Sequence, residues 1–360
     1  MDKYCFENIL IKNKDRVESL KAKTNKIVVF GAGNTACLYL KCFEAEGIDV
    51  QVFVDNNKNK SFTGGQVVSP DSLESECGQD VLVLICTSVD NTYHEIQQQM
   101  EGMGFLCCGV DEYVFAQRMP ELLECYDSFE DEESRDLYAE LIMWRMQHVD
   151  PCLPILHQEQ YFAQRDFLTS SNNEVFVDVG AFVGDTIERY LHKKEGVFGK
   201  IYAFEPDKDN YQALVYRLER LQREWGIKDG RIFPVNCGIG SKKSFRKVYR
   251  PSGTGLGSMV VDSAGDKEHL QNVDIVTIDD YFLEQKVDFI KADIESYEYD
   301  MLLGSSKLIK RDRPKIAICI YHNATDMYRV MLYLKNLNLN YKFQLSHHSV
   351  TKSETVLYAY

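Results

Sequence analysis

Hydrophobic positions between residues 26 and 110 fall into two alternating patterns. Short apolar runs that predict strands are Lys26–Phe30, Val50–Val54, Asp80–Cys86 and Leu106–Val110. Stretches with helical periodicity lie between them at Asn34–Glu46 and Asn91–Met103. The run at 80–86 is nearly continuous, as expected of a parallel strand that is covered on both faces. The alternation predicts a small α/β domain with a parallel sheet over residues 1–110.

The pattern changes over residues 111–172. The acidic stretch Tyr126–Ser134 precedes Leu137–Met146, whose apolar and charged positions suit a helix. Acids in a first helical turn complement the helix dipole, so we interpret them as a solvated helix start rather than a metal site. The segment is predicted to be a helical bridge.

Residues 173–360 repeat the strand–helix alternation. The predicted strands are 174–179, 201–205, 231–236, 288–293 and 314–321, and the predicted helices are 184–194, 208–223, 297–309 and 325–337. The end of the chain differs, because Tyr341–Ser346 and Glu354–Tyr360 are two β-rich stretches joined by a short polar turn. They are expected to pair as an antiparallel hairpin. The prediction is a second α/β domain with a mostly parallel seven-stranded sheet that ends in this hairpin.

Composition restricts the class of protein. The chain has 360 residues, enough for two cored domains, and a net charge of −14 that argues against nucleic acid or an anionic membrane as the main partner. The eleven cysteines form no CxxC pair, which favours reduced thiols in the cytoplasm. The first residues lack a signal pattern, and no apolar run approaches the roughly 20 residues that span a bilayer. We expect a cytoplasmic protein without a membrane span.

Both α/β segments carry a glycine turn after their first strand and an acid after their second. Gly31 and Asp55 are 55 − 31 = 24 positions apart, and Gly180 and Glu205 are 205 − 180 = 25 positions apart. Glycines allow a ligand to approach the backbone, and an acid at the end of the second strand can bind two ribose hydroxyls. The spacing predicts two nucleotide-type sites.

The second segment resembles the FkbM-type methyltransferases. The motifs that carry the resemblance, in the order of that family, are Phe176-Val-Asp-Val-Gly-Ala181, Ala203-Phe-Glu-Pro206, Val276-Thr-Ile-Asp279 and Asp288-Phe-Ile-Lys-Ala-Asp-Ile-Glu-Ser-Tyr-Glu298. With the terminal hairpin, the resemblance covers roughly residues 160–360. It implies a methyltransferase fold and methyl transfer from S-adenosylmethionine to a sugar or similar hydroxyl. The chain departs from the family at Ser296, where glycine is usual.

The resemblance also implies a set of cofactor-binding residues. Gly180 is expected under the methionine portion of the cofactor, near the helix-start amides of Gly184 and Asp185, and Glu205 at the ribose. The full set is Asp178, Gly180, Gly184, Asp185, Glu205, Asn236 and Cys237, the last two beside the adenine. The alternative is an α/β turn that holds no ligand.

Three residues are candidates for catalysis. Asp293 and Glu295 end the fourth strand, where their spacing of two would project both carboxylates to the same face, and His322 ends the fifth. A carboxylate or a histidine can take the proton that a hydroxyl acceptor loses. Asp293 and Glu295 are also candidate ligands for magnesium. The structural alternatives are that Asp293 caps the next helix, that Glu295 is merely exposed and that His322 is a loop histidine.

The ligand of the first site stays open. Gly31, Gly33 and Asp55 fit a nucleotide or nucleotide-sugar pocket, a fold used for dimerisation, or an NAD(P)-dependent nucleotide-sugar oxidoreductase. A non-catalytic nucleotide-sensing module and a homodimer remain alternatives for the whole chain. The glycine-rich stretch Ser252–Ser258 is interpreted as a mobile cover over the second site.

Overall fold

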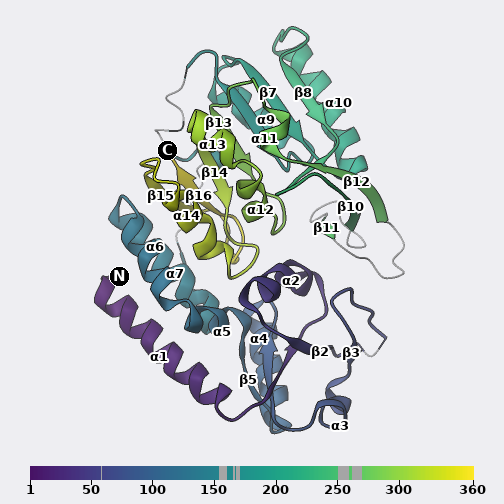
Figure 1. The fold of residues 1–360 in the computed structure, drawn as a ribbon, viewed down its shortest axis with the longest axis vertical. Helices are drawn as coiled ribbons and strands as arrows, with labels where there is room; N and C mark the ends of the chain where they lie inside the picture. Colours follow the sequence, from purple (N-terminus) through teal and green to yellow (C-terminus); the bar gives the residue numbers. More distant parts are fainter. Residues whose placement is uncertain (58, 154–159, 165–166, 168–170, 250–258, 262–269) are drawn as a thin grey trace. The chain divides into compact units, whose positions relative to one another are not determined.

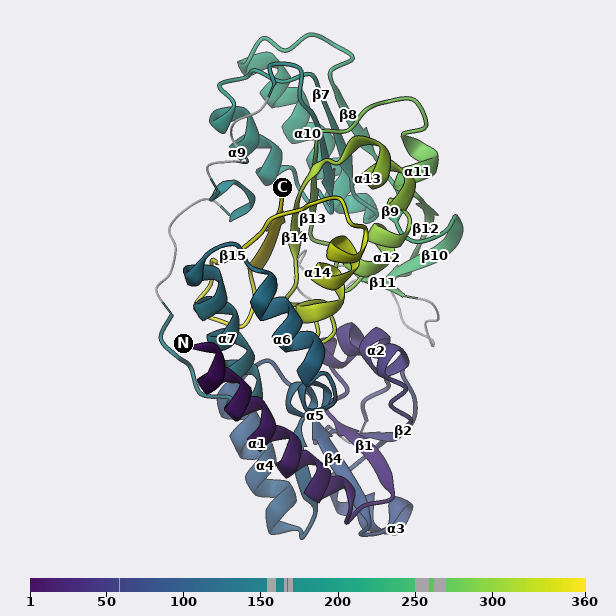
Figure 2. The same cartoon turned by 60° about the vertical axis from the view of Figure 1, so that its left-hand side comes forward.

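The computed structural model describes residues 1–57, 59–153, 160–164, 167, 171–249, 259–261 and 270–360 (Figures 1 and 2). The chain divides into two compact units. The N-terminal unit comprises Met1–Ile155, Tyr321–Tyr328 and Ser349–Ser353, and the C-terminal unit comprises Leu156–Ile320, Arg329–His348 and Glu354–Tyr360. All eleven cysteines are free, and among the described residues no helix is long and apolar enough to cross a membrane.

The N-terminal unit contains a five-stranded parallel sheet in the order β3-β2-β1-β4-β5 (Figure 1). The strands are β1 Lys26–Phe30, β2 Val50–Val54, β3 Val67–Val68, β4 Val81–Ile85 and β5 Leu106–Gly109. The helices between them are α2 Asn34–Glu46, α3 Leu73–Cys77 and α4 Asp90–Gly102, with a short 3-10 turn at Pro70–Ser72. The predicted parallel sheet is confirmed, and the fully buried β4 explains the continuous apolar run.

Helices make up the remainder of this unit. They are α1 Lys3–Lys21, which the periodicity analysis did not predict, and α5 Val110–Gln117, α6 Met119–Ser128 and α7 Glu132–Gln147. The Asp131 carboxylate accepts a hydrogen bond from Ser134 N at 2.7 Å, so an acid of the stretch 126–134 does mark a helix start.

Two short segments from late in the sequence also belong to the N-terminal unit. Tyr138 donates a hydrogen bond to the carbonyl of Met327 at 3.0 Å. The ammonium of Lys352 lies 2.5 Å from the Asp90 carboxylate and 2.8 Å from His148 Nδ1. Residues 321–328 and 349–353 therefore complete the core of a unit whose sheet ends 212 residues earlier (321 − 109).

The C-terminal unit is built on a seven-stranded sheet in the order β15-β16-β14-β13-β6-β7-β8. The strands are β6 Val175–Val179, β7 Lys200–Phe204, β8 Ile232–Val235, β13 Phe289–Ala292, β14 Lys315–Cys319, β15 Phe343–His347 and β16 Thr355–Ala359. Only β16 runs antiparallel to its two neighbours, and it pairs with β15 as a hairpin. The predicted sheet and hairpin are confirmed.

Helices of this unit occur at each predicted position, and a short additional helix at Ile278–Tyr281 was not predicted. They are α9 Asp185–Lys193, α10 Lys208–Glu224, α11 Ile278–Tyr281, α12 Glu298–Leu303, α13 Ser306–Asp312 and α14 Asp326–Asn336, with a 3-10 turn at Gln160–Phe162. The expected single helix at 297–309 is two helices, because the chain turns at Gly304 and Ser305.

A second sheet of four strands was not predicted. It has the order β11-β10-β12-β9 and consists of β9 Gly238–Ile239, β10 Ser244–Tyr249, β11 Met259–Val261 and β12 Leu270–Val276. Val248, Val273 and Ile275 form its small core. The stretch Ser252–Ser258 lies outside the described residues.

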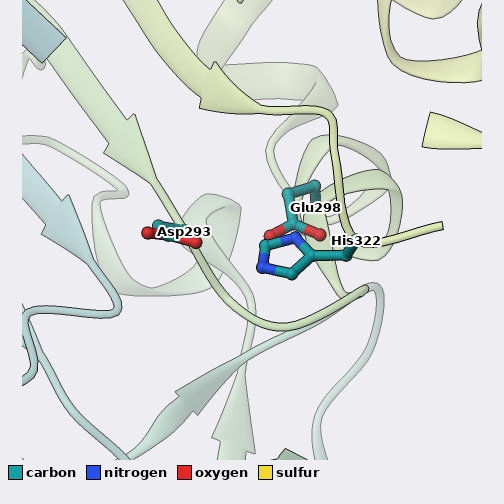
Figure 3. Close-up of side chains that lie close together, drawn as sticks. All are labelled: Asp293, Glu298 and His322. Carbon is teal, nitrogen blue, oxygen red and sulfur yellow. The ribbon is translucent and has the colours of Figure 1, made fainter. Parts of the chain in front are cut away.

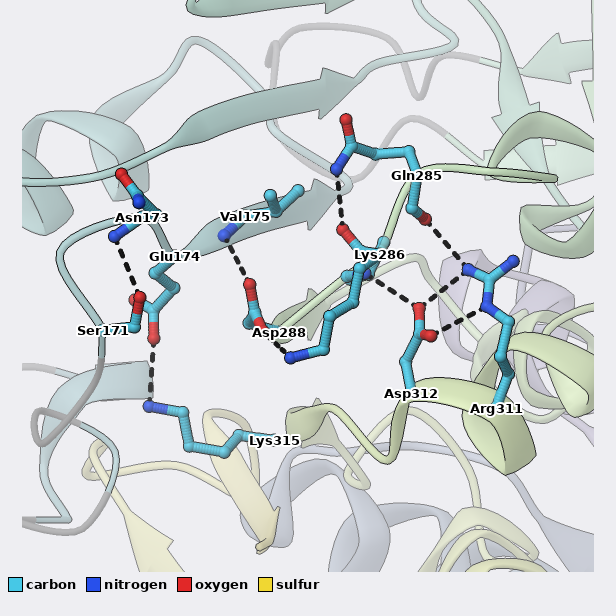
Figure 4. A network of polar contacts seen from close by, with 11 residues as sticks. Ser171, Asn173, Glu174, Val175, Gln285, Lys286, Asp288, Arg311, Asp312 and Lys315 are labelled. Atoms are coloured by element: carbon cyan, nitrogen blue, oxygen red, sulfur yellow. Dashed lines mark hydrogen bonds and ion pairs between the residues drawn. The ribbon is translucent and has the colours of Figure 1, made fainter.

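Buried charges join the amino ends of the central strands (Figure 4). Glu174, which has no exposed surface, accepts a hydrogen bond from Tyr190 at 2.7 Å and pairs with Lys315 at 3.1 Å. Asp288 accepts a hydrogen bond from Val175 N at 3.0 Å and from Lys286 at 2.6 Å (Figure 4). These hydrogen bonds and ion pairs lie at the amino edge of the sheet, whereas the predicted site residues follow the carboxyl ends of the strands.

Candidate active site

The glycine turn after β6 is shaped by its neighbours in the protein. Gly180 has a φ of +79°, and the amides of Gly180 and Ala181 donate to the Phe204 carbonyl at 3.0 and 2.9 Å. A Cβ at Gly180 would overlap with the backbone carbonyl of Asp293. The glycine is therefore required by the packing of two loops at the carboxyl edge, whatever ligand binds there.

Gly184 and Asp185 start helix α9 as predicted. Gly184 is the N-cap with a φ of +83°, and a Cβ there would lie 2.8 Å from Leu214 Cδ1. Asp185 is partly exposed and pairs with Arg189 one turn later at 3.5 Å. The helix start points its first amides toward the same edge of the sheet as the glycine turn.

Glu205 links the glycine turn to the end of β7. One carboxylate oxygen accepts a hydrogen bond from Phe182 N at 2.9 Å, and the other accepts one from Asp207 N at 2.9 Å. The side chain is only 5% exposed, and this burial raises the pKa of Glu205 to about 7. The Asn210 side chain also bonds to this carboxylate, which leaves part of its roughly four acceptor positions for a ligand hydroxyl.

Asn236 and Cys237 lie beside this acid. The Asn236 amide donates to the carbonyls of Glu205 at 2.8 Å and Pro206 at 3.2 Å, which fixes the turn after β7. Cys237 is buried, and burial raises the pKa of its thiol to about 12. The predicted adenine contact of these two residues stays a prediction.

Asp178 forms a buried ion pair that was not predicted from the sequence. Its carboxylate, which has no exposed surface, lies 3.1 Å from the ammonium of Lys291 on β13. Burial raises the pKa of Asp178 to about 6 against the attraction of Lys291. Burial alone would lower the pKa of Lys291, but Asp178 and Asp293 raise it. The two groups therefore form one coupled ion pair, in which each favours the charged form of the other.

Lys291 also holds the glycine turn. Its ammonium donates to the Gly180 carbonyl at 2.6 Å and lies 5.0 Å from the centre of the Tyr161 ring. The second oxygen of Asp178 has no hydrogen-bond donor among the residues that the structure describes. A buried carboxylate oxygen without a donor suits a positively charged ligand group.

Asp293 lies directly after β13, in the loop that packs on Gly180. It accepts a hydrogen bond from the Tyr161 hydroxyl at 2.7 Å. The start of α12 has no side-chain cap, so Asp293 does not cap that helix. Tyr161 was not predicted as a site residue, because the segment before β6 has no motif of its own.

The carboxylate close to Asp293 is that of Glu298 (Figure 3). One oxygen of Glu298 lies within 4.8 Å of one oxygen of Asp293. Glu298 has no exposed surface and accepts a hydrogen bond from Ile294 N at 2.7 Å. Its distance of five residues from Asp293 matches neither strand nor helix periodicity, so the sequence did not indicate it.

The position of Glu295 differs from the expected one at the end of the fourth strand. Strand β13 ends at Ala292, so the alternation of a strand does not extend to Asp293 and Glu295. Glu295 is half-buried in a turn, with a φ of +55°. Its catalytic role stays a prediction, as does magnesium binding by Asp293 and Glu295.

His322 is buried and follows β14 within the segment Tyr321–Tyr328 of the N-terminal unit. Its ring centre lies 4.1 Å from that of Tyr321. Its role as a general base stays a prediction.

The glycine turn after β1 has the predicted backbone conformation, but the Asp55 carboxylate is already hydrogen-bonded within the protein. Gly31 has a φ of +114°, and a Cβ there would lie 2.6 Å from the Cys86 carbonyl oxygen. Asp55 accepts hydrogen bonds from Ala32 N at 3.1 Å and Lys60 at 2.8 Å. Burial alone would raise the pKa of Asp55, but these bonds hold it below its usual value. Gly33 is the N-cap of α2, and the nucleotide contacts of all three residues stay predictions.

Comparison with known proteins supports the motif resemblance. A family model described as the methyltransferase FkbM domain matches residues 178–343. This range begins at Asp178 and includes Glu205, Asp293 and Glu298. No curated protein matches the chain.

A solved structure shares the fold of the chain. The methyltransferase FkbM from Methylobacillus flagellatus KT is 20% identical, aligns over 100% of both chains and has a TM-score of 0.58. An rRNA methylase from Streptococcus thermophilus is 16% identical over 57% of this chain and 96% of its own, with a TM-score of 0.36.

Proposed function

We propose that the protein transfers a methyl group from S-adenosylmethionine to a hydroxyl of a sugar, nucleotide sugar or glycan, because residues 178–343 match the model of the methyltransferase FkbM domain. The observation that carries the proposal is the buried Glu205 carboxylate, bonded to the amide of Phe182 in the glycine turn. An acid at the end of the second strand, joined to the turn after the first, is the arrangement that binds a nucleoside.

The residues at this edge fit the cofactor in charge as well as in position. Asp178 has a buried oxygen without a hydrogen-bond donor in the described part of the chain, which suits the positive amino group of the methionine portion. Glu205 is bonded by Phe182 N, Asp207 N and the Asn210 side chain, and the remaining acceptor capacity of its carboxylate suits a ribose hydroxyl. The first amides of α9 suit the carboxylate of the methionine portion.

The reaction then needs alignment and removal of one proton. The cofactor supplies a methyl group already activated on a sulfonium, so the protein has to orient an acceptor oxygen in line with it. Asp293 is the proposed base that takes the hydroxyl proton, and the Tyr161 hydroxyl fixes its orientation. Glu298, close to Asp293, favours an acceptor that offers further hydroxyl groups to carboxylate oxygens.

Calorimetric titration of the full chain with S-adenosylmethionine and S-adenosylhomocysteine tests the proposal. At pH 8, above the pKa of Glu205, the wild-type protein should bind both, and Glu205→Gln should weaken binding at least tenfold because a ribose contact to a charged acceptor is lost. Asp279→Asn is the matched control, since Asp279 also accepts two backbone hydrogen bonds, from Lys307 N and Leu308 N. Absence of binding by both ligands would refute the proposed cofactor.

A further inference from the structure

The loop between Asp293 and Glu298 contains an unfavourable turn. Tyr297 N donates to the Ile294 carbonyl at 3.3 Å, and the two residues between them, Glu295 and Ser296, have φ values of +55° and +74°. Two positive φ values in succession are those of a type I′ turn, which strongly favours glycine at its second central position. Ser296 therefore adopts a backbone conformation that disfavours any side chain.

The hydroxyl of Ser296 adds a second unfavourable feature. The residue is 6% exposed, and its oxygen has no hydrogen-bond partner among the described residues. Buried hydroxyls are nearly always paired. Ser305, a fully buried serine of the same unit, follows that rule by donating to the Met301 carbonyl at 2.6 Å. Glycine at position 296 would avoid both costs, so the structure of the protein alone gives no reason for serine.

The position of this turn indicates a ligand. The turn follows Asp293, whose carbonyl occupies the space a Cβ of Gly180 would need, and the Ile294 side chain lies 2.9 Å from the same point. Asp293 and Ile294 thus pack against the glycine turn, where the methionine portion of the cofactor lies under the proposed function, and Ser296 follows them two residues later in the same loop. We propose that the Ser296 hydroxyl binds the methionine portion of S-adenosylmethionine, an inference that rests on that function.

Calorimetry with two probes tests the inference on the full chain. S-adenosylhomocysteine contains the amino-acid portion of the cofactor, and 5′-methylthioadenosine lacks it. Ser296→Ala should weaken the binding of S-adenosylhomocysteine about tenfold, which is the contribution of one hydrogen bond to a charged group. The affinity for 5′-methylthioadenosine should stay unchanged. The matched control Ser305→Ala should lower the melting temperature, because it removes a satisfied hydrogen bond, without changing either affinity.

Each other result overturns the inference. Equal binding of S-adenosylhomocysteine by wild type and Ser296→Ala would mean that the hydroxyl has no ligand, and equal weakening of both probes would exclude the methionine portion. If Ser296→Ala does not fold, Ser296→Gly removes the same hydroxyl and relieves the backbone. A wild-type protein that binds neither probe would refute the proposed function, whereas an unaffected variant of a binding wild type refutes the role of Ser296 alone.

Discussion

At the scale of single residues, Glu205 makes stability depend on pH. Burial raises its pKa from the usual 4.5 to about 7, so its contribution to stability is fully present below pH 4.5 and is lost as the pH rises through 7. The loss amounts to about 3 kcal/mol at most. Urea unfolding from pH 5 to 8 should therefore show wild type losing stability relative to Glu205→Gln. Parallel curves for the two proteins would contradict the raised pKa.

Substitution of Asp293 should reduce methyl transfer without changing cofactor binding. Replacing it by asparagine removes the proposed base and keeps the size of the side chain, so cofactor affinity should stay within about twofold while methyl transfer falls by about 10² to 10⁴. Transfer can be followed by mass spectrometry with a panel of methyl glycosides and nucleotide sugars. Tyr161→Phe should cause a smaller loss, since it removes only the hydrogen bond that orients Asp293. Undiminished transfer by Asp293→Asn would make His322 the main candidate for the base.

The sequence predicted those site residues that a local pattern marks. Glu205 ends an apolar strand and Gly180 follows one, and the structure places both at one turn. Lys291 and Tyr161 were missed because their partners lie on other elements, so only the folded chain brings them together. Glu298 was missed because its distance of five residues from Asp293 fits neither strand nor helix periodicity. Lys291 had a signal that was not used: a cation in the middle of a fully buried strand requires a buried partner.

At the scale of elements, the glycine turn depends on close contact between two loops. Gly180→Ala should unfold or strongly destabilise the C-terminal unit, because the new Cβ would overlap with the Asp293 carbonyl at a φ of +79°. Gly226 is a matched control, with a φ of +59° and no atom within 4 Å of an added Cβ. Gly226→Ala should cost only about 1 kcal/mol from the backbone. Urea unfolding compares the two, and equal losses would contradict the packing argument.

Elements of the main sheets were predictable because their strands are apolar on both faces. The strands of the four-stranded sheet were not, because β10 (Ser-Phe-Arg-Lys-Val-Tyr) has only one buried residue, Val248, and no regular alternation, and β9 has two residues. Such strands are formed by pairing with neighbours distant in sequence, as between β10 and β12. Periodicity along the chain carries little information about that pairing.

At the scale of the whole molecule, the N-terminal unit is completed by residues from the end of the chain. Periodicity predicts contiguous segments, so it gave no means of assigning 321–328 and 349–353 to that unit. A fragment that stops before residue 321 lacks the Tyr138–Met327 hydrogen bond and the Lys352 contacts. Titrations of NAD, NADP or nucleotide sugars against the glycine turn at Gly31 therefore require the full chain.

Replacing Lys352 tests how much residues 349–353 contribute to the stability of the N-terminal unit. Lys352 is 7% exposed and contacts both Asp90 at the start of α4 and His148 after α7. Lys352→Met should destabilise the N-terminal unit by about 2 to 3 kcal/mol, less than a fully buried pair because Asp90 is partly exposed. Amide exchange in α4 should become faster.

The same substitution should change the titration of His148. Burial and the charge of Lys352 lower the pKa of His148 to about 4, so removing that charge should raise it, as NMR of the imidazole would show. Lys3→Met is the control, because Lys3 pairs with Asp127 in solvent at 2.5 Å and such pairs contribute little. If both variants leave α4 exchange and the His148 pKa unchanged, residues 349–353 do not support the N-terminal unit in solution.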